Sequence, residues 1–140
     1  MTKKESKKKG NAPGRRVLVV EDNVDAAETL QLLLRMSGYE TRAAYEGASA
    51  VAMVRDFKPS VVLLDIGLPD RDGYDVAREL RTLPEMKSAL LVALTGYGEA
   101  EDREKAERAG FDTFQVKPVE PERLEALLED HFKMLASRAS

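Results

Sequence analysis

Four short apolar runs in this chain each end in a polar residue, and the polar residues together could carry out one reaction. Glu21 and Asp22 follow the first run, Asp65 the second, Thr95 the third and Lys117 the fourth. Unbroken apolar runs are typical of strands buried on both faces of a parallel sheet, and ligands bind beyond the carboxyl ends of such strands. We therefore expect these side chains at one edge of a sheet, where they would suit phosphoryl transfer with a divalent cation.

The three carboxylates of this set are expected to repel one another unless a positive charge lies between them. Mg²⁺ fits because it is a hard cation that takes oxygen ligands, and Mn²⁺ is the alternative. Asp65 is the best candidate nucleophile, since a carboxylate can attack phosphorus to form an acyl phosphate. Thr95 would donate its hydroxyl to a phosphoryl oxygen, and Lys117 would neutralise charge on the transferring oxygens.

Strands and helices alternate five times along residues 16–136. The expected strands cover 16–21, 41–44, 61–65, 90–95 and 114–117, and the expected helices cover 24–37, 47–57, 74–82, 99–109 and 120 to the mid-130s. With right-handed crossovers, this order predicts an α/β fold: a doubly wound five-stranded parallel sheet in the order 2-1-3-4-5 with five helices. We expect one domain at 16–136, a disordered basic tail at 1–15 and a short tail at 137–140.

Helical spacing predicts which residues each helix turns inward. They are Ala26, Leu30, Leu33 and Leu34 in the first helix; Ala48, Val51 and Ala52 in the second; Val76, Ala77 and Leu80 in the third; and Leu124, Leu127, Leu128, Phe132 and Leu135 in the last. The helix at 99–109 offers only Ala100, Ala106 and Ala109 among many charges, so it should be one of the more mobile elements.

Composition excludes several classes of protein. The chain has no cysteine, which rules out disulfides and thiolate metal sites and favours a reducing compartment. No apolar stretch approaches the roughly 20 residues of a membrane helix, and no apolar segment follows the N-terminal lysines as in a secretory signal. Residues 1–16 carry seven Lys/Arg and one Glu, whereas the rest is acidic, so the folded part is not expected to bind nucleic acid.

Three further polar residues are weighed and set aside. His131 is the only histidine, and without a second histidine or any cysteine it is expected at an exposed or rim position rather than in a metal site. Asp70 and Asp72 are expected to shape the turn before Gly73 rather than to extend the acidic cluster.

Five motifs in combination carry a family resemblance. They are Val-Val-Glu-Asp-Asn at 19–23, Leu-Leu-Asp-Ile-Gly-Leu-Pro at 63–69, Asp-Gly at 72–73, Leu-Thr-Gly at 94–96 and Val-Lys-Pro at 116–118. With them, residues 16–136 resemble a receiver domain of two-component response regulators, a CheY-like domain of flavodoxin-like fold.

The resemblance implies a role for each matching residue of the acidic cluster. Asp65 matches the phosphoacceptor and Asp22 the direct Mg²⁺ ligand, with Glu21 its water-mediated neighbour. The carbonyl of Gly67 matches a backbone metal ligand. Gly67 and Tyr97 also stand at the family's variable positions, which tune how fast the acyl phosphate hydrolyses.

The remaining matches concern binding of the phosphoryl group and the response to it. Thr95 and Lys117 match the two residues that bind the phosphoryl group, and the peptide bond before Pro118 matches one that the family usually holds cis. Phe114 stands at the family's aromatic switch position, which is often Tyr, and it lacks the hydroxyl that could bond an exterior partner.

The resemblance implies a stand-alone cytoplasmic phosphoacceptor, not an enzyme, that takes its phosphoryl group from a sensor histidine kinase or a histidine phosphotransfer protein. It would signal to a downstream protein through the 99–136 face, and two copies could also form a dimer through this face. The alternatives are a receiver cut from a hybrid kinase and a non-phosphorylated interaction module of the same fold. An aspartyl-phosphate phosphatase is disfavoured, because that family places a second Asp where this chain has Gly67.

Overall fold

The computed structural model describes residues 15–96 and 100–139, and within them it contains every strand and helix expected from the sequence. The tail predicted at 1–15 lies outside this part of the chain except for Arg15. The elements are β1 (Arg16–Val20), α2 (Val24–Met36), β2 (Glu40–Ala44), α3 (Gly47–Phe57), β3 (Val61–Asp65), α4 (Gly73–Arg81), the short 3-10 helix η1 (Pro84–Met86), β4 (Leu90–Thr95), α5 (Ala100–Ala109), β5 (Thr113–Val116) and α6 (Pro121–Ala139). Only η1 was not expected.

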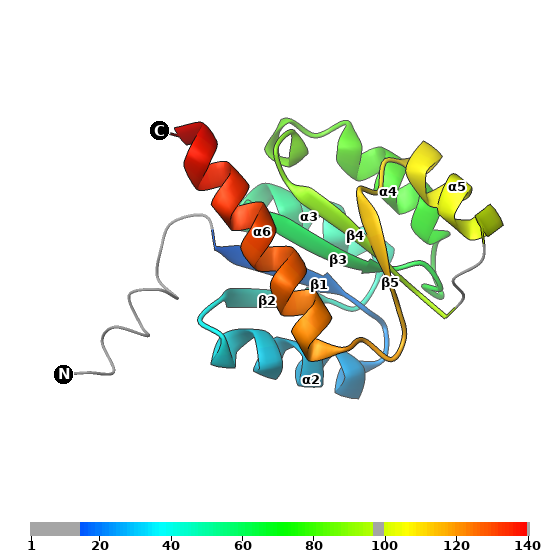
Figure 1. Cartoon of the computed structure of the whole chain (residues 1–140). Coiled ribbons are helices and arrows are strands. Elements are labelled where there is room, and N and C mark those ends of the chain that lie inside the picture. The colour runs from blue at the N-terminus through cyan, green and yellow to red at the C-terminus, as the bar shows by residue number, and fades with distance from the viewer. Residues whose placement is uncertain (1–14, 97–99, 140) are drawn as a thin grey trace.

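The five strands form one parallel sheet in the order β2-β1-β3-β4-β5, which is the predicted topology (Figure 1). The central strands β1 and β3 are buried from end to end apart from Arg16, as their unbroken apolar runs predict. The register pairs Val20 with Leu64 and Asp65 with Leu94. The carboxyl ends of β1, β3 and β4 therefore lie at one edge of the sheet.

Helices cover both faces of the sheet (Figure 1), and a hydrophobic layer lies between the sheet and the helices on each face. Successive residues of a strand point to opposite faces, so Leu18 and Val20 pack with α3, α4 and α5, while Val17 and Val19 pack with α2 and α6. Both layers are needed because every strand of a parallel sheet requires cover on each side. No helix in the described parts of the chain is long and apolar enough to span a membrane.

The predicted inward face of α2 is partly wrong. Ala26 is exposed, and Ala27 is buried in its place beside the expected Leu30. Gln31 is also buried, because its amide oxygen accepts hydrogen bonds from the Thr41 hydroxyl at 3.1 Å and from Arg35 at 3.1 Å. The spacing of apolar residues does not predict that Gln31 is buried, because Gln31 is polar and its partner Thr41 lies on the next strand.

The predicted inward face of α3 is also partly wrong, although the expected Val51 is half-buried and packs on the core. Ala48 and Ala52 are exposed, and the buried residues are Gly47, Ala50, Val54 and Phe57. Gly47 packs so closely on α4 that a Cβ there would lie 2.8 Å from Val76 Cγ2, and this contact fixes the rotation of the helix. The inward residues Val76, Ala77 and Leu80 of α4 are buried as expected, as are Leu124, Leu128 and Phe132 of α6.

Asp70 does more than shape its own turn. Its carboxylate accepts hydrogen bonds from the backbone amides of Gly47 at 2.9 Å and Ala48 at 3.1 Å, so it caps the start of α3 from another loop. These bonds are the main reason that the pKa of Asp70 is lowered. Asp72 caps α4 through the Tyr74 amide at 2.8 Å.

The prediction for His131 is wrong, because its side chain is only 6% exposed. It lies on α6, edge-on to the Phe132 ring at 5.6 Å between centroids. Neither ring nitrogen has a hydrogen-bond partner among the described residues. Burial lowers the pKa of His131, while the Ser60 backbone and the Asp112 carboxylate favour the charged form less strongly.

Candidate phosphoacceptor and metal site

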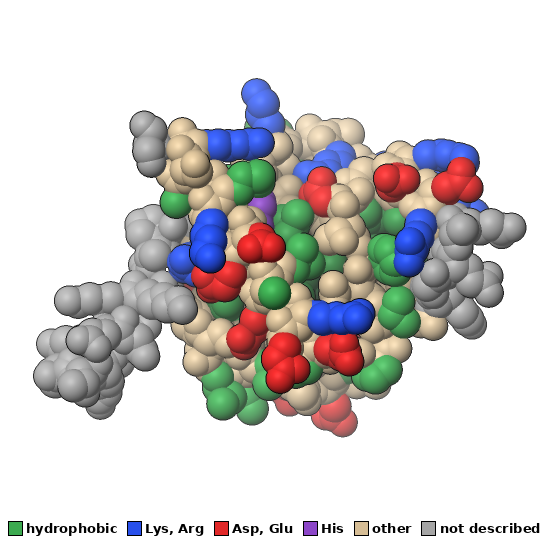
Figure 2. Space-filling view, viewed as in Figure 1, with side chains coloured by type: hydrophobic (Ala, Val, Ile, Leu, Met, Phe, Trp, Pro, Cys, Tyr) green, Lys and Arg blue, Asp and Glu red, His purple; other side chains and the backbone are tan. Residues whose placement is uncertain are grey.

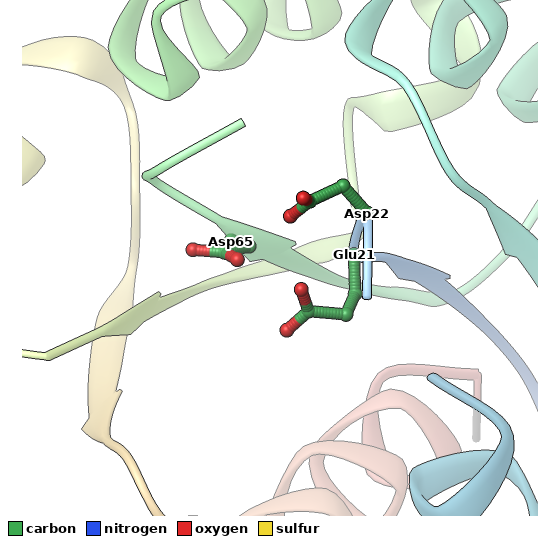
Figure 3. A group of neighbouring side chains, drawn as sticks. All are labelled: Glu21, Asp22 and Asp65. Atoms are coloured by element: carbon green, nitrogen blue, oxygen red, sulfur yellow. The ribbon is translucent and has the colours of Figure 1, made fainter. Parts of the chain in front are cut away.

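Three carboxylates meet where β1 and β3 end, and their carboxyl groups lie close together (Figure 3). Each of Glu21, Asp22 and Asp65 offers an oxygen within 4.8 Å of those of the other two. Glu21 and Asp65 are buried at 4% and 7% exposure, whereas Asp22 is exposed. The strand ends thus hold two of the carboxylates rigidly and leave the third open to solvent.

Lys117 bridges the two buried carboxylates. Its ammonium nitrogen lies 2.8 Å from Asp65 Oδ2 and 2.8 Å from Glu21 Oε1. The backbone of Lys117 is fixed by its own amide, which donates to the Thr95 carbonyl at 2.7 Å. Charge-assisted bonds of this kind hold both acceptor groups in place.

In both Glu21 and Lys117, burial and the hydrogen bond between the two side chains shift the pKa in opposite directions. Burial raises the pKa of Glu21, the bond from Lys117 opposes that rise, and the neighbouring Asp65 adds to it. Burial alone would lower the pKa of Lys117, but the bonds to Asp65 and Glu21 outweigh it and raise that pKa. The raised pKa of Lys117 means that its ammonium group is charged between the two carboxyl groups.

The donor set fits a hard divalent cation. Three oxygen-bearing side chains converge, and one of them is accessible to solvent. Mg²⁺ takes oxygen ligands and retains waters, so an open side of this kind suits it.

The loop after β3 turns back over Asp65. The Gly67 amide donates to Asp65 Oδ1 at 2.9 Å, and the Gly73 amide donates to the Ile66 carbonyl at 3.1 Å. Gly73 approaches so closely that a Cβ there would lie 2.5 Å from Ile66 Cα. Both carboxylate oxygens of Asp65 are thus held, one by Gly67 and the other by Lys117.

The two residues expected to respond to phosphorylation lie on neighbouring strands. Thr95 is the buried last residue of β4 and pairs with Val116 in the register, and Phe114 is half-buried and pairs with Ala93. The Lys117–Pro118 peptide bond is cis, the isomer that the resemblance implies. Tyr97, the expected kinetic position, lies outside the described residues.

Sequence reasoning missed two features beside the cluster. The Asn23 amide donates to Glu21 Oε2 at 3.1 Å, while its side chain accepts from the Ala26 amide at 2.9 Å and caps α2. An Asn just before a helix is a recognisable cap signal, so this residue could have been found. A largely apolar cavity of about 600 Å³ adjoins Glu21 and Lys117; α2 and the segment after β5 line it, including Leu33 and Val119.

The family model of the response regulator receiver domain matches residues 17–129. The chain belongs to this family, whose members serve two-component signal transduction as phosphoacceptor domains rather than as ordinary enzymes. It is similar to an uncharacterized 14.6 kDa protein of Leptolyngbya boryana, 30% identical over 82% of this chain and 88% of that protein. The probable transcriptional regulator ycf27 of Cyanophora paradoxa is 36% identical over 80% of this chain, which covers only 46% of that protein.

Two solved structures are informative about the site. The receiver domain of the sensor histidine kinase PA1611 from Pseudomonas aeruginosa, with magnesium in its active-site cleft, is 30% identical with a TM-score of 0.76 over 84% of this chain and 96% of that one. The Saccharomyces cerevisiae receiver domain of Ssk1, solved with the histidine phosphotransfer protein Ypd1, is 26% identical to this chain with a TM-score of 0.80. The match covers 86% of this chain and 90% of that one.

Proposed function

We propose that this chain accepts a phosphoryl group from a phosphohistidine onto Asp65, with Mg²⁺, and signals by a change in its surface. The observation that carries this proposal is the shared ammonium of Lys117, at 2.8 Å from both Asp65 and Glu21, beside the open carboxylate of Asp22. A buried nucleophile, a fixed cation and an accessible metal ligand are the parts that phosphoryl transfer needs.

In the proposed reaction an oxygen of Asp65 forms a bond to phosphorus as the phosphorus–nitrogen bond of the donor breaks. The donor imidazole keeps the electron pair of that bond and takes a proton from solvent. Lys117 neutralises charge on the transferring oxygens, and Thr95 donates its hydroxyl to one of them. Asp22, Asp65, the Gly67 carbonyl and, through water, Glu21 would hold Mg²⁺, which screens the negative charge of the incoming group.

The proposed response begins at Thr95. The new dianion draws this hydroxyl inward, and the ring of Phe114 then fills the space it leaves beside the small Ala93. That movement repacks α5, whose described buried residues are only Ala106 and Ala109. The change is a shift between two states biased by a local charge.

The proposed partners follow from the surface around the site. The apolar cavity between α2 and Val119 would receive the phosphodonor, a sensor kinase or a phosphotransfer protein, beside Lys117. The 99–136 face would contact a downstream protein or a second copy. Acidic side chains gather over α6 toward α2 (Figure 2), which supports the proposal that this face does not bind nucleic acid. We propose a cytoplasmic location, with the receiver of a hybrid kinase as the alternative context.

The decisive test is the intact mass of the wild type, Asp65→Asn and a matched Asp56→Asn after incubation with Mg²⁺ and acetyl phosphate. Asp56 is an exposed carboxylate at the end of α3, so its loss controls for charge. We expect one hydroxylamine-labile phosphoryl group on wild type and Asp56→Asn and none on Asp65→Asn. A wild type that remains unmodified by acetyl phosphate and by phosphohistidine donors would leave the interaction module as the better explanation.

A further inference from the structure

Arg103 of α5 covers the ring of Phe114 on β5. Its guanidinium carbon lies 4.7 Å from the ring centroid, within the range of a cation–π contact. Phe114 is half-buried and packs on the core cluster that includes Ala106 and Phe111. A cavity of about 330 Å³ adjoins the same ring and is lined by residues of α5 and the segment around β5. The ring therefore has open space beside it and a cation that favours its present place.

We infer that Arg103 is a positioning residue that holds the Phe114 ring in its resting place and so sets how readily the domain changes state. The inference rests on the proposed function, in which that ring moves inward. An exposed cation–π contact favours the resting place by about two- to fivefold. Removing the contact makes the active state more accessible, and the apparent affinity for a ligand of that state rises by the same factor.

The sign of the effect separates this role from simple electrostatics. Removing any cation weakens the attraction of the protein for an anion. Arg103→Ala would then bind a phosphoryl analogue less tightly than wild type. Loss of the Phe114 restraint has the opposite consequence, tighter binding. Arg108 supplies a matched control, since it is an exposed arginine on the same helix with Glu104 as its partner at 3.6 Å.

The experiment uses the full chain with 4-fluorophenylalanine at its four phenylalanines, and Phe114→Leu identifies the Phe114 fluorine resonance. Wild type, Arg103→Ala, Arg103→Lys and Arg108→Ala are titrated with beryllofluoride in saturating Mg²⁺. We expect Arg103→Ala to bind about two- to fivefold more tightly than wild type, Arg103→Lys to fall between them, and Arg108→Ala to bind as wild type or more weakly. In the absence of ligand, only the Arg103 variants should shift the Phe114 resonance.

Equal or weaker binding by Arg103→Ala would overturn the inference. If the wild type itself takes up no beryllofluoride, the proposed function fails, and the ligand-free spectra still decide the role of Arg103. A Phe114 resonance unchanged in Arg103→Ala would then refute the contact in solution, and a shift confined to the Arg103 variants would support it.

Discussion

At the scale of single residues, the central feature is one ammonium shared by two buried carboxylates. Lys117 lies 2.8 Å from Glu21 and 2.8 Å from Asp65, so it occupies the position that best offsets their charge. A cation in the same cluster competes with this ammonium for the carboxylate oxygens. Lys117 should therefore assist phosphoryl transfer while weakening the binding of Mg²⁺.

Lys117→Met is expected to separate these two effects. Loss of one positive charge beside the cluster should tighten Mg²⁺ binding by about tenfold, after allowance for the partial exposure of the side chain. The rate of phosphorylation by acetyl phosphate should fall by about 100-fold or more, because charge on the transferring oxygens is no longer offset. Calorimetric Mg²⁺ titration and intact mass over time measure the two quantities.

Lys87→Met removes an exposed lysine after η1 and should change neither quantity. Mg²⁺ binding that is unchanged or weaker in Lys117→Met would contradict the proposed competition between the ammonium and the metal.

At the scale of elements, the loop between β3 and α4 holds Asp65, the proposed nucleophile. Gly73 begins α4 and touches the backbone of Ile66, the residue directly after Asp65. A Cβ at position 73 would lie 2.5 Å from Ile66 Cα and 2.8 Å from its carbonyl oxygen, and backbone atoms cannot move aside as a side chain can. The absence of a side chain at Gly73 thus sets the path of the chain behind Asp65.

Gly73→Ala should lower the free energy of unfolding by on the order of 1–3 kcal/mol, the usual cost of overpacking, and should slow phosphorylation of Asp65. The chain has no tryptophan, so urea denaturation is best followed by far-ultraviolet circular dichroism. Gly96→Ala is the control, since no described atom lies within 4 Å of its Cβ position. Equal stability of the two variants would show that the loop adjusts to a side chain at position 73.

At the scale of the whole molecule, the buried His131 links folding to pH. Because burial lowers its pKa in the folded state, the unfolded chain binds a proton more readily. The contribution of His131 to stability is complete when the pH is above its pKa in the unfolded chain, about 6.5. This contribution is lost as the pH falls through the lower pKa of the folded state. The charged groups that influence it are Asp112, which favours the proton, and Arg138, which disfavours it.

The free energy of unfolding of wild type should therefore fall between pH 7 and pH 5 more steeply than that of His131→Leu, by up to about 1.4 kcal/mol per pH unit. Glu21 has a raised pKa and changes stability in the opposite direction, but it is present in both proteins and cancels in the comparison. Val54→Ala, a truncation in the hydrophobic layer on the other face of the sheet, should lower stability without changing its pH dependence. Parallel pH profiles for wild type and His131→Leu would show that His131 does not titrate in this range.

The sequence predicted the sheet order and the gathering of Glu21, Asp22 and Asp65, and the structure contains both. The reason is that fully apolar strands are buried whichever way their side chains alternate, and that parallel strands end at the same edge. A site built from residues just past those ends can be found without knowing how the helices pack.

Only the tertiary structure decided the buried faces of α2 and α3, where Asp70 caps α3, that His131 is enclosed, and that Arg103 covers Phe114. Each helical residue turns by about 100° from the last, so a rotation of the helix by part of that angle exchanges Ala26 for Ala27 at the core. Residues elsewhere in the chain set that rotation: Thr41 donates a hydrogen bond to Gln31 of α2, and Val76 packs against Gly47 of α3. Local spacing determines the strand ends and therefore the site, whereas contacts between distant segments determine the helix faces.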